Sequence, residues 1–189
     1  MVDSPNTTRS SSGSKPAEVE YTVEIVPGVA DLDAAAWDRL LDPDAAPFLE
    51  HRFLKSLEDS QRLTERTGWI PRIPLLRRDG VLVAAAPAYV KLNSQGEFVY
   101  DWSWANFAQQ QGLPYYPKLV VGVPFTPVTG RRILTAPGED RPMLIRAMGQ
   151  ALAEIAEAME LTSVHVNFTH EDEIEGLTEI GYLHRLQMQ

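Results

Sequence analysis

The spacing of apolar and polar residues predicts alternating strands and helices from residue 21 onward. Residues 21–26 alternate apolar and polar side chains, which is typical of a strand with one buried face. Leucine, alanine and tryptophan then recur at helical spacing up to about Leu41, behind Asp31 and Asp33, either of which can cap a helix. Apolar residues on one face of 50–60 predict a second helix.

Two strands joined by a tight turn are expected next, at about Ile70–Arg77 and Val81–Leu92. The Asp79-Gly80 pair between them is a strong hairpin signal, because both residues tolerate the positive φ angles of a two-residue turn. The second strand begins with apolar residues on both faces, which favours a central position in a sheet. Pro87 lies inside it and indicates a bulge or a change of partner strand.

The rest of the chain continues the alternation. The expected elements are a helix at Asp101–Gln111, strands at Lys118–Val123 and Arg131–Thr135, a long helix at Arg141–Leu161, a strand at Ser163–Phe168, an acidic helix from Thr169 or His170 to about Ile180, and a strand beginning in Leu183–Gln189. Helices interspersed with hairpins predict an α/β fold with a central mixed sheet covered by helices on both faces. This order resembles the acyltransferase fold of the GNAT superfamily.

One stretch, Asn93–Arg131, departs from this regular pattern. It contains eight of the sixteen aromatic residues, together with four glycines and four prolines, and only three charged residues precede Arg131. A segment rich in rings and chain-turning residues costs conformational freedom to order. We therefore expect a shaped surface built from loops, where binding or catalysis usually resides.

Composition narrows the class of protein. A chain of 189 residues with 44% hydrophobic residues is expected to form one domain, over residues 20–189, behind a Ser-rich disordered tail at 1–19. The net charge of −9 argues against a nucleic-acid-binding surface. Apolar runs stay well short of the roughly 20 residues that span a bilayer, so no membrane span is expected. The sequence has no cysteine, which excludes disulfides and thiolate chemistry and fits a cytoplasmic location.

Two carboxylates lie inside the aromatic stretch, Glu97 and Asp101. A carboxylate held among apolar rings has a raised pKa and can act as a general base near neutral pH, so both are catalytic candidates. The alternative is a structural role, since Asp101 can simply start the helix that follows. Lys118 can meet a phosphate or a carboxylate, or it can be a solvated lysine on a strand edge. The substrate-binding candidates are Ser94, Gln95, Tyr100, Trp102, Trp104, Tyr115, Tyr116, Lys118, Phe125 and Thr126.

Signals for a metal or a nucleotide are weak. Acyltransferases that use coenzyme A need a glycine-rich turn before a helix, so that free N–H groups can face the pyrophosphate. Residues 129–132 offer one glycine and two arginines, and a further strand separates them from the helix at 141–161, so coenzyme A binding is not assigned there. The four histidines lack metal-ligand spacing, and no metal is expected.

Three motifs together resemble one bacterial family: SQGEFVYDWSWA at 94–105, YYPKL at 115–119 and VPFTPVTG at 123–130. These are similar to the FemAB-like, GNAT-type proteins of peptidoglycan biosynthesis/recognition, from about Pro47 to the C-terminus. The resemblance implies an acyl or aminoacyl transferase that acts on an amine of a cell-wall precursor or similar small molecule. The donor would be acyl-CoA or aminoacyl-tRNA, with Glu97 or Asp101 as the base. Asn93 stands where relatives often have histidine.

The same resemblance implies that this chain corresponds to the N-terminal one of two acyltransferase-like halves. The second half would be absent, and the surface left by it could support a homodimer. An alternative function stays open: a non-catalytic module whose aromatic-lined groove binds a glycan or a peptide. A glycine-rich pyrophosphate loop would favour coenzyme A chemistry over binding, and the sequence lacks one.

Overall fold

The computed structural model describes residues 21–43, 45–99 and 101–186. The predicted tail and Tyr100 lie outside the described residues. The helices are α1 (Ala34–Asp38), α2 (His51–Asp59), α3 (Trp102–Gln110), α4 (Arg141–Ala158) and α5 (Glu171–Glu179), with short 3-10 turns η1 (Pro47–Leu49) and η2 (Glu65–Thr67). The strands are β1 (Tyr21–Val26), β2 (Trp69–Pro71), β3 (Ile73–Arg78), β4 (Val81–Ala85), β5 (Ala88–Lys91), β6 (Lys118–Val121), β7 (Leu134–Thr135) and β8 (Val164–Val166).

The strands form two four-stranded sheets, in the orders β1-β3-β4-β7 and β2-β5-β6-β8. Backbone bonds join the sheets: the Arg72 amide donates to the Ala88 carbonyl (2.9 Å), and the Ala86 amide donates to the Pro74 carbonyl (3.2 Å). The strand pairs β2/β3 and β4/β5 are therefore halves of two longer strands. The predicted mixed sheet exists, bent at this junction. Pro87 marks the change of partner strand, from β7 alongside β4 to β6 alongside β5.

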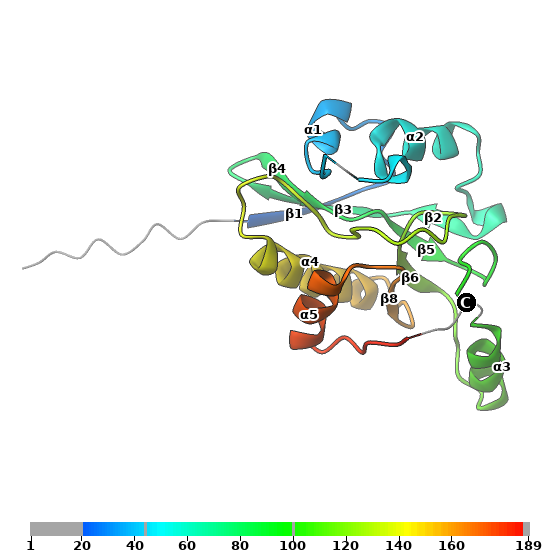
Figure 1. The fold of residues 1–189 in the computed structure, drawn as a ribbon. Helices are drawn as coiled ribbons and strands as arrows, with labels where there is room; N and C mark the ends of the chain where they lie inside the picture. Colours follow the sequence, from blue (N-terminus) through cyan, green and yellow to red (C-terminus); the bar gives the residue numbers. More distant parts are fainter. Residues whose placement is uncertain (1–20, 44, 100, 187–189) are drawn as a thin grey trace, which may run out of the picture.

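Helices cover both faces of this sheet, as predicted (Figure 1). α1 and α2 lie on one face, where they bury Trp37 and Leu54. α4 and α5 lie on the other, where α4 packs a stripe that includes Leu144, Met148 and Leu152 against the strands. α3 projects away from the body in Figure 1, and none of its residues is buried. The sheet thus fixes the ends of β5 and β6 between two packed cores.

The strand predicted to begin in Leu183–Gln189 is absent from the described part of that segment, residues 183–186. Leu183–Leu186 is irregular, and its two leucines are 82% and 92% exposed. β8 pairs with β6 and has no second neighbour among the described strands, so this segment makes no ladder. The alternation that predicted a strand is not accompanied by burial of either face.

A long insertion interrupts one strand of the bent sheet. Val121 at the end of β6 lies opposite Ala88, and Leu134 in β7 lies opposite Ala85, so residues 122–133 leave the strand and return to it. We call these residues the insertion loop. β7 continues the line of β6, and the loop that separates them contains the whole VPFTPVTG motif.

The insertion loop is held by buried charges. Glu173 is fully buried and accepts hydrogen bonds from the amides of Arg132 (2.8 Å) and Ile133 (2.7 Å) and from Arg141 Nη2 (3.1 Å). The Arg132 guanidinium donates to the Asn167 carbonyl at 2.7 Å. The predicted strand at 131–135 is shortened to two residues, because two of its amides bond to this carboxylate instead of a neighbouring strand.

Candidate active site

Two buried lysines stand across from each other where β5 ends and β6 begins. Lys91 and Lys118 are register partners, and neither side chain is exposed. Lys118 Nζ lies 2.5 Å from Asp101 Oδ2 and 3.0 Å from Glu97 Oε2. The interpretation of Lys118 as a solvated strand-edge lysine is therefore wrong. The inward face of the strand places its ammonium between the two predicted carboxylates.

The carboxylates have unused hydrogen-bonding capacity. Glu97 is 4% exposed and Asp101 is 6% exposed. Both oxygens of Glu97 and the Oδ1 atom of Asp101 lack a hydrogen-bond partner among the described residues, and the Glu97–Lys118 contact is an ion pair without hydrogen-bond geometry. A buried acceptor left unpaired costs about 1–3 kcal/mol. In folded proteins such acceptors are paired with water, an ion or a bound ligand, or have a catalytic role.

Burial and charge separate the acid–base properties of this cluster. Burial raises the pKa of Glu97 above its usual range, and the nearby Lys118 only partly opposes this. Burial also acts to raise the pKa of Asp101, but the hydrogen bond and charge of Lys118 outweigh it, and the net pKa is lowered. Burial lowers the pKa of Lys91 to about 8. The cluster thus combines one carboxylate that readily takes up a proton with one that stays ionised.

Side chains from β2 and β5 hold the turn that carries Glu97. The Gln95 carbonyl accepts hydrogen bonds from Trp69 Nε1 (3.0 Å) and from Lys91 Nζ (2.9 Å). The Lys91 ammonium also lies 3.9 Å from the centre of the Trp69 ring, a cation–π contact. Gly96 has φ +77°, and a Cβ there would lie 2.6 Å from the Phe125 ring, so the turn requires glycine. Gln95 therefore contributes its backbone, and Phe125 packs against the same turn.

Sequence reasoning missed Lys91 and Trp69. A charged residue closing the apolar run of 81–92 is the signal that pointed to Lys91, because a lysine at a buried strand position requires a partner. Trp69 carried no comparable signal. Its role depends on the pairing of β2 with β5, where Trp69 lies opposite Lys91.

We call Lys91, Glu97, Asp101 and Lys118 the charge cluster. Two tyrosines lie between this cluster and the surface. The Tyr116 hydroxyl lies 2.6 Å from Ser94 Oγ and donates to Asp101 Oδ2 at 3.3 Å. The Lys118 ammonium lies 4.9 and 5.0 Å from the centres of the Tyr115 and Tyr116 rings. Burial raises the pKa of both tyrosines, so their hydroxyls remain protonated donors at neutral pH.

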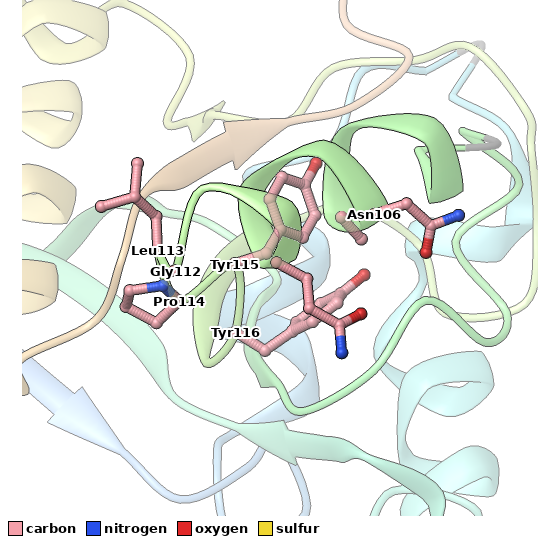
Figure 2. Close-up of a pocket in the computed structure, with 8 residues that line it drawn as sticks. Asn106, Gly112, Leu113, Pro114, Tyr115 and Tyr116 are labelled. Atoms are coloured by element: carbon pink, nitrogen blue, oxygen red, sulfur yellow. The ribbon is translucent and has the colours of Figure 1, made fainter.

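A cavity of about 500 Å³ opens on the outer side of these tyrosines (Figure 2). Asn106 comes from α3, and Tyr115 and Tyr116 come from the segment that follows it; the remaining lining residues are Ala105, Gln109, Gly112, Leu113 and Pro114. The volume is within the range of small-molecule sites, about 300–1,000 Å³. The structure therefore places a cavity of ligand size next to the buried cluster.

Three predicted site residues lie apart from the charge cluster, and a fourth lies outside the residues that the structure describes. Trp102 and Trp104 are 65% and 53% exposed on α3, and the Arg185 guanidinium stacks over the Trp104 ring at 4.6 Å. Thr126 donates its hydroxyl hydrogen bond to the Pro124 carbonyl within the insertion loop. Tyr100 lies outside the described residues. Asp101 does sit at the start of α3, but its side chain makes no capping bond.

The start of α4 is poorly suited to phosphates. Asp140 caps the helix, and its carboxylate accepts from the Met143 amide at 3.0 Å. Pro142 removes one further N–H from the first turn. A phosphate at this end would meet a carboxylate and fewer free amides, the opposite of the arrangement that binds pyrophosphate.

No group of three or more His, Cys, Asp or Glu residues within residues 21–43, 45–99 and 101–186 is arranged to hold a metal ion. In the same part of the chain, no helix combines the length and apolarity needed to cross a bilayer.

Solved acetyltransferases share this fold. Ribosomal-protein-alanine N-acetyltransferase from Brucella melitensis biovar Abortus 2308 superposes with a TM-score of 0.53 at 14% identity, over 90% of this chain and 97% of that one. Aminoglycoside N-acetyltransferase AAC(6')-Iy, solved in complex with CoA, gives a TM-score of 0.53 at 12% identity, over 93% and 96%. At such identities the likeness establishes the fold, which is GNAT-like as predicted.

Comparison of the sequence with known proteins and family models is more specific about the family than the shared fold is. No curated protein matches the chain significantly. The model of the FemAB-like family, described as peptidoglycan biosynthesis/recognition, matches residues 28–189. This match includes all three motifs and every member of the charge cluster. The chain therefore belongs to the FemAB-like family of peptidoglycan biosynthesis/recognition.

Proposed function

We propose that this chain is an acyl or aminoacyl transferase domain of the Fem type that acylates an amine of a cell-wall precursor or similar small molecule. One observation carries the proposal: Glu97 and Asp101 are buried, and three of their oxygens have no hydrogen-bond partner among the described residues. An amine offers the N–H donors that these oxygens lack. The GNAT-like fold and the family membership support acyl transfer as the reaction class.

In this proposal the two carboxylates have different tasks. Asp101 stays ionised beside Lys118 and orients the neutral amine of the acceptor by accepting one of its N–H groups at Oδ1. Glu97, with its raised pKa, takes a proton from the nitrogen as it attacks the acyl carbonyl. The new C–N bond forms, the ester or thioester bond to the donor breaks, and the proton passes from Glu97 to the leaving oxygen or sulfur. Glu97 is then ready for another turnover.

The donor is proposed to bind without a pyrophosphate cradle on α4. Asp140 and Pro142 at the start of that helix disfavour phosphate there. This favours an aminoacyl ester, as in aminoacyl-tRNA, over a coenzyme A thioester held by α4. The net charge of −9 implies that contacts with a nucleic-acid donor are confined to its acylated end.

The test is transfer to muropeptides that carry a free side-chain amine, followed by mass spectrometry. Alanyl-tRNA and acetyl-CoA are supplied separately as donors. We expect a mass gain of one alanyl group with the first donor and a loss of about 10²–10⁴-fold in rate for Glu97→Gln. Glu24→Gln, which removes a surface carboxylate remote from the site, is the matched control. Full transfer by folded Glu97→Gln would contradict the assignment of the base.

A second candidate function, a glycan- or peptide-binding module, is favoured by one observation. Trp102, Trp104 and Phe107 on α3 are all more than half exposed, beside the cavity lined by Tyr115. Aromatic faces pack well on sugar rings and apolar stems. Binding of muropeptides without transfer from either donor, lost in Trp104→Ala and kept in Glu97→Gln, would favour this function over the first.

A further inference from the structure

A second cavity, of about 480 Å³, lies at the other end of the insertion loop. Thr129–Arg131 line one side of it, and Leu41–Pro43, Ala45 and Ala46 line the other. Phe125, near the start of the same loop, packs on Trp69 beside the charge cluster, with ring centres 5.4 Å apart. One loop therefore contacts two separate places, and the second of them has no assigned role.

The floor of this cavity is apolar. Leu40, Leu49 and Leu134 line it, and each is at most 3% exposed. They come from α1's C-terminal flank, η1 and β7, so the floor is fixed by elements far apart in sequence. Ala45 and Ala46 add small side chains to the wall, which leaves the volume open.

The cavity also contains two opposite charges side by side. Arg131 Nη1 lies 2.6 Å from Asp42 Oδ1, and their side chains are 30% and 32% exposed. Both residues line the cavity. A partly exposed pair of this kind is screened by solvent on its open side, so exchanging it for ligand contacts costs less than breaking a buried pair.

We propose that this cavity binds a free apolar α-amino acid. An α-amino acid carries a carboxylate and an ammonium on one carbon, with its side chain projecting from the same atom. Arg131 would bind the carboxylate with its planar fork of N–H donors, and Asp42 would accept from the ammonium. The side chain would occupy the floor formed by Leu40, Leu49 and Leu134. The site is distinct from the carboxylate cluster and does not require transferase activity.

The experiment is calorimetric titration of the chain with L-leucine and three analogues, each lacking one recognised feature. N-acetyl-leucine lacks the ammonium, leucinamide lacks the carboxylate, and glycine lacks the side chain. We expect saturable binding of L-leucine and at least about tenfold weaker binding of each analogue, since each lost contact corresponds to about 1.4 kcal/mol or more. Equal affinity for L-leucine and any one analogue, or no heat with L-leucine, would overturn the proposal.

Variants locate the site. Arg131→Gln and Asp42→Asn are each expected to weaken L-leucine binding at least tenfold. Arg131→Lys keeps the charge but loses the fork, and is expected to bind weakly as well. The control is Arg77→Gln, which breaks the Arg77–Glu24 pair (2.8 Å), an exposed ion pair of the same type on β3. Circular dichroism checks that each variant is folded, and unchanged binding in folded Arg131→Gln and Asp42→Asn would also overturn the proposal.

Failure here is separable from failure of the transferase proposal. Glu97 belongs to the charge cluster, far from the second cavity in the sequence. The Glu97→Gln variant is therefore expected to bind L-leucine like the parent chain while losing transferase activity. Leucine binding that disappears in Glu97→Gln would place the amino acid in the first site and overturn the assignment to the second cavity.

Discussion

Lys91 and Lys118 lie directly opposite each other on antiparallel strands, both fully buried. Like charges in this position repel, and the arrangement persists because the neighbours differ. Lys118 is flanked by two carboxylates, whereas Lys91 donates to a backbone carbonyl and rests on the Trp69 ring. The two ammonium groups are thereby given separate roles: Lys118 neutralises the carboxylates, and Lys91 supports the turn that presents Glu97.

Replacing Lys118 with methionine should be strongly destabilising. The change leaves Glu97 and Asp101 buried without their cation, and breaking a buried pair in this way costs about 3–5 kcal/mol. Urea unfolding followed by circular dichroism measures the loss. Arg146→Met, which removes an exposed partner of Glu179 (3.1 Å), should change the free energy of unfolding by less than about 1 kcal/mol. Equal changes in unfolding free energy for both variants would show that the buried ion pairs of Lys118 contribute little to stability.

Replacing Glu97 with glutamine should have the opposite effect on stability. The raised pKa of Glu97 means that burial penalises its charged form more than Lys118 compensates. The neutral isostere avoids that penalty, so the free energy of unfolding at pH 7 should rise. The expected gain shrinks as the pH falls and Glu97 becomes protonated in the parent chain. A lower unfolding free energy at pH 7 would contradict this account.

Replacing Trp69 with phenylalanine should loosen the turn that carries Glu97. The variant loses the indole hydrogen bond to Gln95 and weakens the cation–π contact with Lys91, at a cost of about 1–3 kcal/mol. Trp37→Phe is a matched control, because Trp37 is equally buried and its indole donates to the Leu49 carbonyl at 2.9 Å. Hydrogen exchange should accelerate at the amides of 94–97 in the first variant alone.

His165 should make stability depend on mildly acidic pH. Burial and the nearby Lys118 lower its pKa to about 4, against about 6.5 in an unfolded chain. Between these values the unfolded chain binds a proton that the folded chain does not, so stability falls as the pH falls from 6.5 to 4. The loss is of order 3 kcal/mol when complete.

The measurement is the difference in unfolding free energy between the parent chain and His165→Gln, across pH 4 to 7. Subtraction cancels the carboxylates that titrate in both proteins. The difference should change by a few kcal/mol over this range. A flat line for His165→Gln would contradict the lowered pKa.

Local signals in the sequence were sufficient for much of the fold. Asp79 and Gly80 adopt φ +50° and +78°, as the hairpin turn requires, and Pro87 marks the change of partner strand. The apolar stripe of α4 predicted its buried face and its first residue, Arg141, and the helix ends at Ala158 rather than at the predicted Leu161. These features depend on neighbours a few residues apart, for which residue type alone determines the favoured conformation.

The candidate site was predictable only in part. Glu97, Asp101 and Lys118 stood out as rare charges among aromatic residues, and the structure brings all three together. The pairing of Lys91 with Lys118 was not predictable, because it depends on the register of strands separated by a long irregular segment. The exposure of Trp102 was not predictable either, because aromatic content alone does not indicate whether a helix packs against the rest of the fold.

The insertion loop leaves and rejoins the sheet at neighbouring points. Its two ends are pinned opposite Ala88 and Ala85, with Pro87 between them. Within the loop, the Gly122 and Gly130 amides donate to the Pro87 and Phe168 carbonyls, each at 3.0 Å.

Ile133 is fully buried, and the amides of Arg132 and Ile133 bond to Glu173, so the returning end of the loop is fixed as firmly as a strand. The junction therefore holds Phe125 and Arg131 at a set separation, so the two places that the loop contacts keep a constant spatial relation to each other.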